Sequence, residues 1–370
     1  MKLPMMGVIN LIHETEQMGP LTLERCLATV PFGSRYRLID FVLSSMVNSG
    51  VPNVAVFAHT KYRSLMDHLG SGSNWDLHHK KGGLFVLPPA MDNQADFGKG
   101  DLYHFYRHLD YFSRSAQEYV VVARSHMVCN VDFGEVLSHH LDRGADITVV
   151  CKEWPRANTG LTRKVRADAD GRVLEMQDHF GTLVSDLVSM EMYIMRKELL
   201  MELVQSSLAQ GKDHLVRHAI QSRLAELNVS VYKHEGRLAV VNTIPSFYRH
   251  NMELLDPDVW NDLFYRPGPI YTKVKDEPPT RYRRGSEAVH SLIANGCEIE
   301  GAVYGSILFR GVKVRPGAVI SNCIVMQNSV IGEDSSLENC ILDKEVEVRP
   351  LKGLKGSAET PFVAMKRNVI

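Results

Sequence analysis

Apolar, β-branched runs alternate with amphipathic segments along the N-terminal part of the chain. After a first apolar stretch at 6–11, three runs have the length and composition of buried strands: 51–57, 119–123 and 147–151. Two segments between them carry apolar residues at helical spacing: 61–69 and 133–143. Alternation of strands and helices predicts a mostly parallel sheet with helices on both faces. We therefore expect a Rossmann-like, nucleotide-binding type of α/β domain over residues 1–255.

A different period governs the C-terminal region. Pairs of apolar residues six positions apart recur there, with small or turn-forming residues between them: Ile293 and Ile299, Val314 and Ile320, Ile331 and Leu337, Leu342 and Val348. A hexapeptide repeat of this kind predicts a parallel β-helix whose apolar side chains stack inward. We expect a short, left-handed β-helix over residues 287–370. Five prolines interrupt the segment 256–286, which we interpret as a linker with a short helix near 259–264.

Composition and charge narrow the function classes. With 370 residues the chain exceeds the usual size of a single domain. The formal net charge of −1 gives no electrostatic reason to expect nucleic acid or an anionic membrane as a partner. The six cysteines lie scattered, without the CxxC spacing of a zinc site, and no run approaches the roughly 20 apolar residues of a membrane helix. These features favour a cytoplasmic protein with reduced thiols.

The segment after the first predicted strand lacks the chemistry of a phosphate-binding loop. Glycines in such loops let backbone N–H groups approach anionic oxygens closely. Residues 12–17 are Ile-His-Glu-Thr-Glu-Gln, and no glycine occurs between Gly7 and Gly19. A carboxylate about 4 Å from a phosphate charge is repelled by roughly 4 kcal/mol at an effective dielectric of about 20. The segment carries Glu14 and Glu16, so it is expected to bind ATP poorly.

Eight short motifs together resemble one enzyme family over nearly the whole chain. They begin with Gly-Pro-Leu-Thr and lie, in order, at 19–22, 30–33, 36–44, 47–50, 144–146, 211–213, 251–255 and 269–272. Each motif is weak alone, but their order and spacing resemble glucose-1-phosphate adenylyltransferase (ADP-glucose pyrophosphorylase). The chain looks most like the non-catalytic GlgD-type subunit of the bacterial two-subunit enzyme. The resemblance implies a nucleotidyltransferase domain followed by a short β-helix.

Departures from the catalytic pattern of this family fall on its charged groups. The Gly-Gly-Arg-Gly-Thr-Arg loop of the family aligns with residues 12–17, and a family lysine and two aspartates that resemble magnesium ligands are also replaced. The degenerate positions are Glu14, Gln17, Leu27, His126 and Val240. The resemblance implies Mg²⁺ in catalytic relatives, but neither valine nor imidazole is a good magnesium ligand. We therefore expect no catalytic residue, no metal site and no cofactor in this chain.

Two further departures lie on the sugar side of the family's site. The family's Glu-Lys-Pro element has no counterpart around residues 175–179. Glu191 stands where the family has the glycine of Ser-Met-Gly-Ile-Tyr. A larger acidic side chain there is expected to intrude on the sugar pocket.

Some charged residues remain as candidates for a vestigial nucleotide-sugar or effector site. Residues 98–101, Gly-Lys-Gly-Asp, resemble the family's Gly-Thr-Ala-Asp, which lines the nucleotide-sugar site. The basic run 281–284, with Lys273 and Lys275 nearby, indicates either a site for an anionic effector or a solvated edge of the linker. The candidates are Arg25, Lys99, Asp101, Arg281 and Arg283. The pairs His78-His79 and His139-His140 predict no metal site, because adjacent residues on a helix point in different directions.

Three hypotheses from different classes follow. We favour a non-catalytic, regulatory subunit that assembles with a catalytic glucose-1-phosphate adenylyltransferase chain and controls the supply of ADP-glucose for glycogen. The resemblance implies a tetramer, formed with that relative or by self-association. The alternative is a weakly active adenylyltransferase that makes ADP-glucose from ATP and glucose 1-phosphate with Lys99, Asp101 and Asp132. An acyltransferase built on the hexapeptide helix is disfavoured, because such enzymes need a longer helix with a catalytic histidine and none follows His290.

Overall fold

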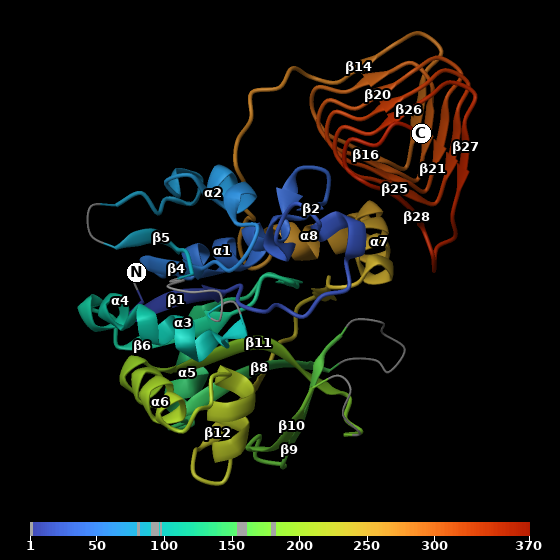
Figure 1. Ribbon diagram of the computed structural model, residues 1–370. Helices are drawn as coiled ribbons and strands as arrows, with labels where there is room; N and C mark the ends of the chain where they lie inside the picture. The colour runs from blue at the N-terminus through green and yellow to red at the C-terminus, as the bar shows by residue number, and fades with distance from the viewer. Residues whose placement is uncertain (1–2, 80–81, 90–95, 97, 154–160, 179–182) are drawn as a thin grey trace.

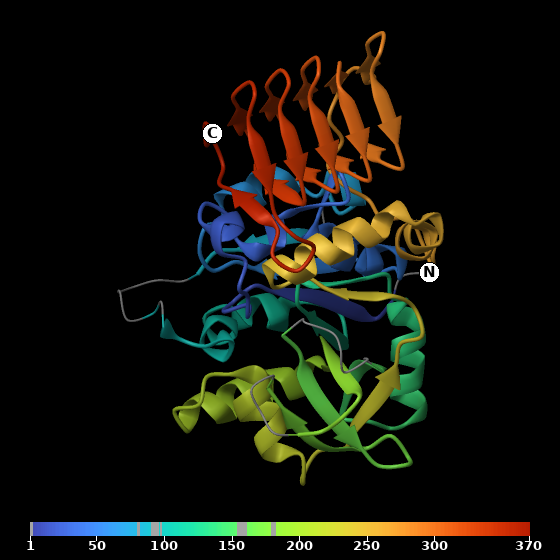
Figure 2. The ribbon, with the colours of Figure 1, turned by 90° about the vertical axis from the view of Figure 1, so that its right-hand side faces the viewer.

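The chain folds into an α/β domain and a β-helix that stands on one side of it (Figure 1). The computed structural model describes residues 3–79, 82–89, 96, 98–153, 161–178 and 183–370. A view turned by 90° shows the coils of the β-helix side by side above the α/β domain (Figure 2). The fold class predicted from the hydrophobic pattern and the resemblance is confirmed.

Nine strands of the described ranges form one sheet of mixed parallel and antiparallel strands in the α/β domain. The order along it is β10-β9-β11-β6-β1-β4-β5, with β8 beside β11 and β12 beside β8. Parallel pairs join β6, β1, β4 and β5, and also β8 and β12, whereas β11 is antiparallel to both β6 and β8. The bounds are β1 Met5–Asn10, β4 Asn53–Phe57, β5 Gly83–Leu87, β6 Tyr119–Ala123, β8 Ile147–Glu153, β9 Arg163–Ala167, β10 Val173–Gln177, β11 Leu187–Arg196 and β12 Val229–Lys233.

Helices cover both faces of this sheet, as the alternation of strands and helices predicts. On one face pack α1 (Leu38–Asn48), α2 (Arg63–Leu69) and α5 (Phe133–Asp142). On the other pack α3 (Asp101–Arg107), α4 (Leu109–Arg114), α6 (Lys197–Ala209) and the π-helix η5 (Leu215–Ile220). The helices predicted at 61–69 and 133–143 are therefore confirmed as α2 and α5.

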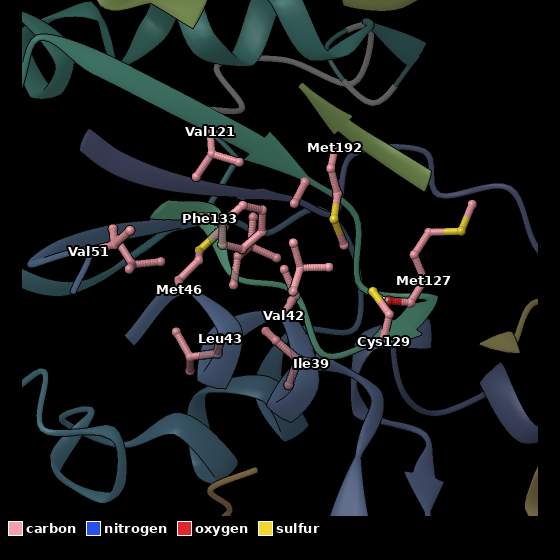
Figure 3. Packing of buried hydrophobic residues seen from close by; sticks show 14 of the residues in the cluster. Ile39, Val42, Leu43, Met46, Val51, Val121, Met127, Cys129, Phe133 and Met192 are labelled. Carbon is pink, nitrogen blue, oxygen red and sulfur yellow. Dashed lines mark hydrogen bonds between the residues drawn. The ribbon is translucent and has the colours of Figure 1, made fainter. Parts of the chain in front are cut away.

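Side-chain alternation along a strand explains why the central strands are apolar throughout. In β1, Met5 and Ile9 belong to the core under α1, whereas Met6 and Val8 belong to the core on the opposite face. Every residue of β1 is buried. Figure 3 shows the first of these cores, where the apolar face of α1 points toward the sheet with Ile39, Val42, Leu43 and Met46.

Smaller elements fill the space between the sheet and the β-helix. β7 (Met127–Cys129) pairs antiparallel with β13 (Leu238–Val240), which sets Val240 opposite Met127. β2 (Pro31–Phe32) pairs with β3 (Tyr36–Arg37) in a hairpin before α1. Two helices follow β13: α7 (Ile244–Met252) and α8 (Pro257–Tyr265). The short 3₁₀ helices are η1 Gly19–Thr22, η2 Leu27–Thr29, η3 Ser73–Trp75, η6 Gln221–Arg223 and η7 Glu253–Leu255.

Three parallel sheets of five short strands each, within the described residues, form the left-handed β-helix. The first contains β14 Arg281–Tyr282, β17 Glu298–Ile299, β20 Lys313–Val314, β23 Val330–Ile331 and β26 Glu347–Val348. The second contains β15 Glu287–Val289, β18 Ala302–Tyr304, β21 Val319–Ser321, β24 Ser336–Glu338 and β27 Gly353–Lys355. The third contains β16 Leu292–Ile293, β19 Ile307–Leu308, β22 Ile324–Val325, β25 Cys340–Leu342 and β28 Phe362–Ala364.

The hexapeptide spacing has a direct structural meaning. Each step of six residues moves the chain from one sheet to the next, as from Val314 in β20 to Ile320 in β21. Equivalent apolar residues then stack on successive coils, as Val314 does on Ile331. The repeat predicted from the sequence is thus confirmed, and its members line the interior of the β-helix.

The third β-helix sheet is buried on both faces. Leu308 and Val325 point inward to the coil interior, whereas their neighbours Ile307 and Ile324 point outward to a core shared with α7, α8 and α1. In that shared core, Phe264 of α8 contacts Phe41 of α1 at a ring-centroid distance of 5.4 Å. The segment 256–286, expected to be a linker, therefore contributes α8 to this core and enters the first coil at β14. The short helix expected near 259–264 is confirmed as α8.

Candidate functional site

A cleft of about 370 Å³ opens at the carboxyl ends of β1 and β6. The chain leaves β1 toward β4 on one side and returns to β6 on the other, so that the strand order reverses at this point. In open α/β sheets such a crevice is the usual position of a bound ligand. Asp101, Arg124, His126, Arg163 and Glu191 are among its lining residues. We call this cavity the nucleotide cleft.

Asp101 and Arg124 form the floor of the nucleotide cleft. The Asp101 carboxylate accepts hydrogen bonds from Asn10 Nδ2 at 2.8 Å and from the Leu215 N–H at 2.7 Å. Arg124 Nη2 lies 3.4 Å from the same carboxylate, and Arg124 Nη1 donates to the carbonyl oxygens of Asn10 and Ile12. These contacts, most of them with residues at the end of β1, hold both charged side chains in place.

The acidic segment after β1 does not present its carboxylates to the cleft as expected. Glu14 is turned toward the chain, where its carboxylate accepts the Ser125 N–H at 2.8 Å and the Ser125 hydroxyl at 2.8 and 3.0 Å. Glu16 accepts the Met18 N–H at 2.5 Å and the Thr22 hydroxyl at 3.1 Å. Neither carboxylate lines the cleft, and weak ATP binding by this segment stays a prediction. The carboxylate oxygens of Glu14 and Glu16 already accept hydrogen bonds from groups of the protein.

Charge around Glu14 keeps this buried carboxylate ionised. Burial opposes its ionisation, but the neighbouring His126 and Arg124 and the Ser125 N–H together outweigh that cost and lower the pKa of Glu14. His126 Nδ1 lies 3.6 Å from Glu14 Oε1. His126 thus faces an acid of its own chain.

The other degenerate positions lie in or near the apolar interior. Leu27 and Val240 are buried in hydrophobic cores, Val240 completely. Gln17 is exposed, and its N–H donates to the carbonyl oxygen of Asn242 at 2.6 Å. Among these residues, the Glu14 and His126 side chains lie close together, and the pairing of β13 with β7 sets Val240 beside the backbone at His126, where the Val241 N–H donates to the His126 carbonyl.

The residues present do not fit magnesium. Mg²⁺ requires carboxylate or phosphate oxygens in near-octahedral geometry. At the two positions that resemble the family's magnesium aspartates, this chain presents an imidazole and a valine sealed in the core. Across the described ranges, no cluster of three His, Cys, Asp or Glu side chains has a geometry that could hold a metal ion.

The residues named for an altered active site are separated. Asp101 lines the cleft, but Asp132 caps the N-terminus of α5, where it accepts the N–H groups of Gly134 and Glu135. Lys99 is exposed and its carbonyl oxygen lies 3.0 Å from the His13 Nε2. The structure therefore does not assemble Lys99, Asp101 and Asp132 into one constellation.

An ion network fills one wall of the nucleotide cleft. Arg163 Nη1 lies 2.7 and 2.8 Å from the two oxygens of Glu191, and its Nε lies 2.8 Å from Asp178. Asp178 also binds Arg217 at 2.6 Å. Burial opposes the charge of Arg163, but Glu191, Tyr193 and Asp178 outweigh it and raise the pKa of the guanidinium.

Glu191 reaches this network from an unusual backbone position. Its φ is 54°, in the left-handed region, and it sits where the pairing of β11 with β8 shifts register. Glycine adopts this conformation at no cost, so the acidic residue is held there by its ion pair. Glu191 does line the cleft, in the direction expected from the resemblance. Of the segment around 175–179, Asp178 lines the cleft and residue 179 lies outside the described residues.

The predicted anion-binding arginines are already paired. Arg25 forms a two-pronged ion pair with Asp343 of the β-helix, at 2.8 and 3.0 Å, and both side chains are buried. Arg281 lies 3.7 Å from Glu298, and Arg283 lies 3.8 Å from Glu300. These pairs form a ladder of alternating charge on the outer face of the β-helix. The expectation of an effector site at Arg25, Arg281 and Arg283 is not supported by these positions.

A second, basic cavity of about 150 Å³ lies between the two domains. Six cationic side chains of the described residues line it: Arg35, Arg37, Lys273, Lys275, Arg310 and Lys344. Burial, with the charges of Arg37 and Arg25 nearby, lowers the pKa of Lys344 to about 7. Burial and Arg35 likewise lower the pKa of Arg310. We call this cavity the basic cleft; sequence reasoning found only Lys273 and Lys275, because its residues come from separate segments.

Fold and cleft together define a nucleotidyltransferase-type α/β domain that carries a hexapeptide β-helix. Residues 14–263 match the nucleotidyl transferase family, and residues 277–354 match the GlmU-like, C-terminal hexapeptide family. The chain belongs to the nucleotidyl transferase family, in the group of GlgD proteins and glucose-1-phosphate adenylyltransferases. No helix in the described part of the chain is long and apolar enough to cross a membrane.

Individual relatives show the same grouping. The glycogen biosynthesis protein GlgD of Bacillus subtilis (strain 168) is 40% identical over 363 residues, 98% of this chain and 96% of its own length. The GlgD protein of Geobacillus stearothermophilus is 43% identical over 99% of this chain and 97% of its own length. The glucose-1-phosphate adenylyltransferase of Pseudothermotoga lettingae is 30% identical over 82% of this chain and 73% of its own length.

Proposed function

We propose that this chain is a non-catalytic, regulatory subunit of ADP-glucose pyrophosphorylase in glycogen biosynthesis. In the cytoplasm it assembles with a catalytic glucose-1-phosphate adenylyltransferase chain, in a tetramer, and raises the activity of that chain or changes its response to effectors. Two relatives named as glycogen biosynthesis protein GlgD match nearly the full chain and support this pathway.

One observation carries the proposal: the scaffold is retained, while the two positions that resemble the family's magnesium aspartates hold His126 and Val240. Nucleotidyl transfer from ATP depends on magnesium and basic side chains, because the protein does little covalent chemistry itself. Here His126 is committed to Glu14, and Val240 is buried in the core. Arg163 is committed to Glu191 and Asp178. We infer that the nucleotide cleft does not turn over substrate.

The basic cleft is the part of the chain that we assign to regulation. Arg35 and Arg37 come from the α/β domain, whereas Arg310 and Lys344 come from the β-helix. An anion bound among them would contact both domains and relieve the repulsion between their charges. An effector can shift a conformational equilibrium only if it binds one of the two conformations more tightly than the other. An anionic effector therefore suits this cavity.

A weakly active adenylyltransferase is the second candidate, favoured by one feature. The nucleotide cleft remains about 370 Å³ in volume, with the Asp101 carboxylate and Arg124 on its floor. Of the three residues named for that active site, Lys99, Asp101 and Asp132, only Asp101 lines the nucleotide cleft.

The test is ADP-glucose synthesis by this chain alone, by a catalytic adenylyltransferase chain alone, and by the two mixed, with pyrophosphate release as readout. The proposal predicts no turnover by this chain and a higher rate in the mixture than in the catalytic chain alone. An equal mass of an unrelated protein controls for nonspecific stabilisation. Turnover by this chain near that of the catalytic chain would favour the second candidate. An unchanged rate and unchanged effector response in the mixture would contradict the regulatory role.

A further inference from the structure

Glu14 fills a small crevice between the segments that leave β1 and β6, next to the nucleotide cleft but not part of its lining. The segment that leaves β1 carries Glu14, and the segment that leaves β6 carries Arg124, Ser125 and His126. Hydrogen bonds join these two segments at the carboxyl ends of their strands. A crevice of this kind is where α/β sheets commonly place anionic ligand groups. In this chain a side chain of the protein lies there instead.

The groups around the Glu14 carboxylate are donors or cations. The Ser125 N–H and hydroxyl both donate to it, at 2.8 Å to Oε1. His126 Nδ1 lies 3.6 Å away and, within the described residues, has no hydrogen-bond partner. Arg124 adds positive charge from the side of β1. The nearby carboxylate of Asp101 is itself bonded to Asn10, Leu215 and Arg124.

This set of groups has the chemistry of an oxyanion site. A backbone N–H, a hydroxyl, an imidazole and a guanidinium are the groups with which proteins bind phosphate oxygens. A carboxylate offers two oxygens and one negative charge, so it satisfies the same donors. The side chains of Glu14 and His126 are each only 5% exposed. The crevice is therefore filled while Glu14 remains in place.

The backbone of the segment is anchored on both sides of Glu14. The preceding Ile12 carbonyl accepts Arg124 Nη1 at 2.5 Å. The His13 ring lies 3.0 Å from the Lys99 carbonyl and packs on His59 at 4.5 Å between ring centroids. Beyond Glu14, the Gln17 N–H is bonded to Asn242. These contacts hold the segment in position independently of the carboxylate.

We propose that Glu14 is an internal occupant of an anion-binding site, and that shortening its side chain opens the site to a phosphate-type anion. The site would consist of the Ser125 N–H and hydroxyl, His126 and Arg124. The inference concerns the isolated chain and goes beyond the proposed regulatory function, because it needs no partner. Its failure would leave the comparison of activities with a catalytic chain unaffected.

The alternative is that Glu14 only completes the hydrogen bonds of Ser125. Side-chain size separates the two accounts. Glu14→Ala and Glu14→Ser empty the crevice, whereas Glu14→Gln removes the charge but keeps the crevice filled. Glu16→Ala is the matched control on the same segment, because the Glu16 carboxylate accepts hydrogen bonds from Met18 and Thr22 of its own loop.

The experiment is calorimetric titration of pyrophosphate, without metal, into the full chain and these variants. Binding in the basic cleft is common to all of them and cancels in the comparison. We expect the Glu14→Ala and Glu14→Ser variants to bind pyrophosphate at this site at least about tenfold more tightly than the wild-type chain does. Glu14→Gln and Glu16→Ala should stay within about twofold of wild type. Adding His126→Ala to Glu14→Ala should remove most of the gain.

Two results would overturn the proposal. The first is a folded Glu14→Ala or Glu14→Ser chain, by circular dichroism, whose pyrophosphate affinity equals that of wild type. The second is an equal gain in Glu14→Gln, which would assign the effect to charge and not to vacated space. If Glu14→Ala does not fold, Glu14→Ser carries the same test, because its hydroxyl can accept the Ser125 N–H.

Discussion

The two clefts of this molecule balance charge in opposite ways. In the nucleotide cleft, Arg163 lies against Glu191 and Asp178, and Arg124 lies against Asp101. In the basic cleft, six cations converge, and the pKa of Lys344 falls to about 7 because burial and neighbouring arginines disfavour its charge. One cavity is neutralised by the protein itself, and the other is left with a surplus of positive charge.

This difference in charge pairing indicates which of the two cavities is more favourable for an anionic ligand. A buried charge without a partner costs free energy that an incoming counter-ion can recover. The nucleotide cleft has no such deficit, since carboxylates of the chain already serve its arginines. The basic cleft has one, and it lies between the domains. Removing a cationic side chain should therefore destabilise the chain in the nucleotide cleft and stabilise it in the basic cleft.

The largest effect is expected from Arg163→Ala. This change leaves Glu191, whose side chain is 11% exposed, without its cation and Asp178 with only Arg217. Removing one partner of such a buried pair typically costs about 3–5 kcal/mol. Urea unfolding followed by circular dichroism measures the loss. A change below about 1 kcal/mol would show that the network does not hold the cleft together.

Lys344 should give a stability that rises with pH. Its pKa is about 7 in the folded chain, below the ordinary value of 10.5, so between these values the unfolded chain binds more protons. Stability then increases with pH above 7, by at most about 1.4 kcal/mol per pH unit and by about 2 kcal/mol up to pH 9. Below pH 7 both states are protonated and the cost of the buried charge is complete.

The variant Lys344→Met isolates this contribution. It should be more stable than wild type at pH 6, and its stability should lack the rise between pH 7 and pH 9. Unfolding free energies of both chains, measured at pH 6, 7, 8 and 9, provide the comparison. Parallel curves for the two chains would contradict the assignment to Lys344.

Inorganic phosphate should stabilise the chain through the basic cleft. A ligand present at about ten times its dissociation constant adds about 1.4 kcal/mol to the free energy of unfolding. Arg310→Gln should reduce this gain, and Arg315→Gln serves as the matched control, because Arg315 pairs with Glu300 on the outside of the β-helix. Melting temperatures with and without phosphate measure the effect. Equal gains in both variants would place the phosphate elsewhere.

The smallest effect is expected on the outer ladder of the β-helix. The Arg283 side chain is 53% exposed and lies 3.8 Å from Glu300. Exposed pairs of this kind contribute about 0.5 kcal/mol or less. Arg283→Ala should therefore leave the urea midpoint nearly unchanged. A loss as large as that of Arg163→Ala would remove the distinction between buried and exposed charge pairs.

The elements of the fold follow from local patterns in the sequence. The run at 119–123 is β6 residue for residue, and the six-residue spacing gives the coils of the β-helix. Both patterns reflect which side chains are buried, and the spacing of buried side chains can be recognised within a short stretch of sequence. The sequence also points to Glu191, which lines the nucleotide cleft.

Charge pairing depends on contacts that no local pattern contains. Arg25 and Asp343 are 318 positions apart in the chain and meet because the β-helix folds back on the α/β domain. The basic run 281–284 suggested a ligand, but its arginines meet glutamates on the next coil. The composition of the segment sets Glu14 apart from a phosphate-binding loop, but the direction of its carboxylate depends on the distant Ser125.

The central claim is that the nucleotide cleft has lost its metal-dependent nucleotide chemistry while the scaffold stays intact. The most direct measurement is calorimetric titration of ATP into the isolated chain, with and without Mg²⁺, beside a catalytic adenylyltransferase as reference. The account predicts that magnesium adds nothing to ATP binding by this chain, whereas it strengthens binding to the reference. Magnesium-dependent ATP binding that disappears in an Asp101→Asn variant would contradict the account. It would favour an active adenylyltransferase instead.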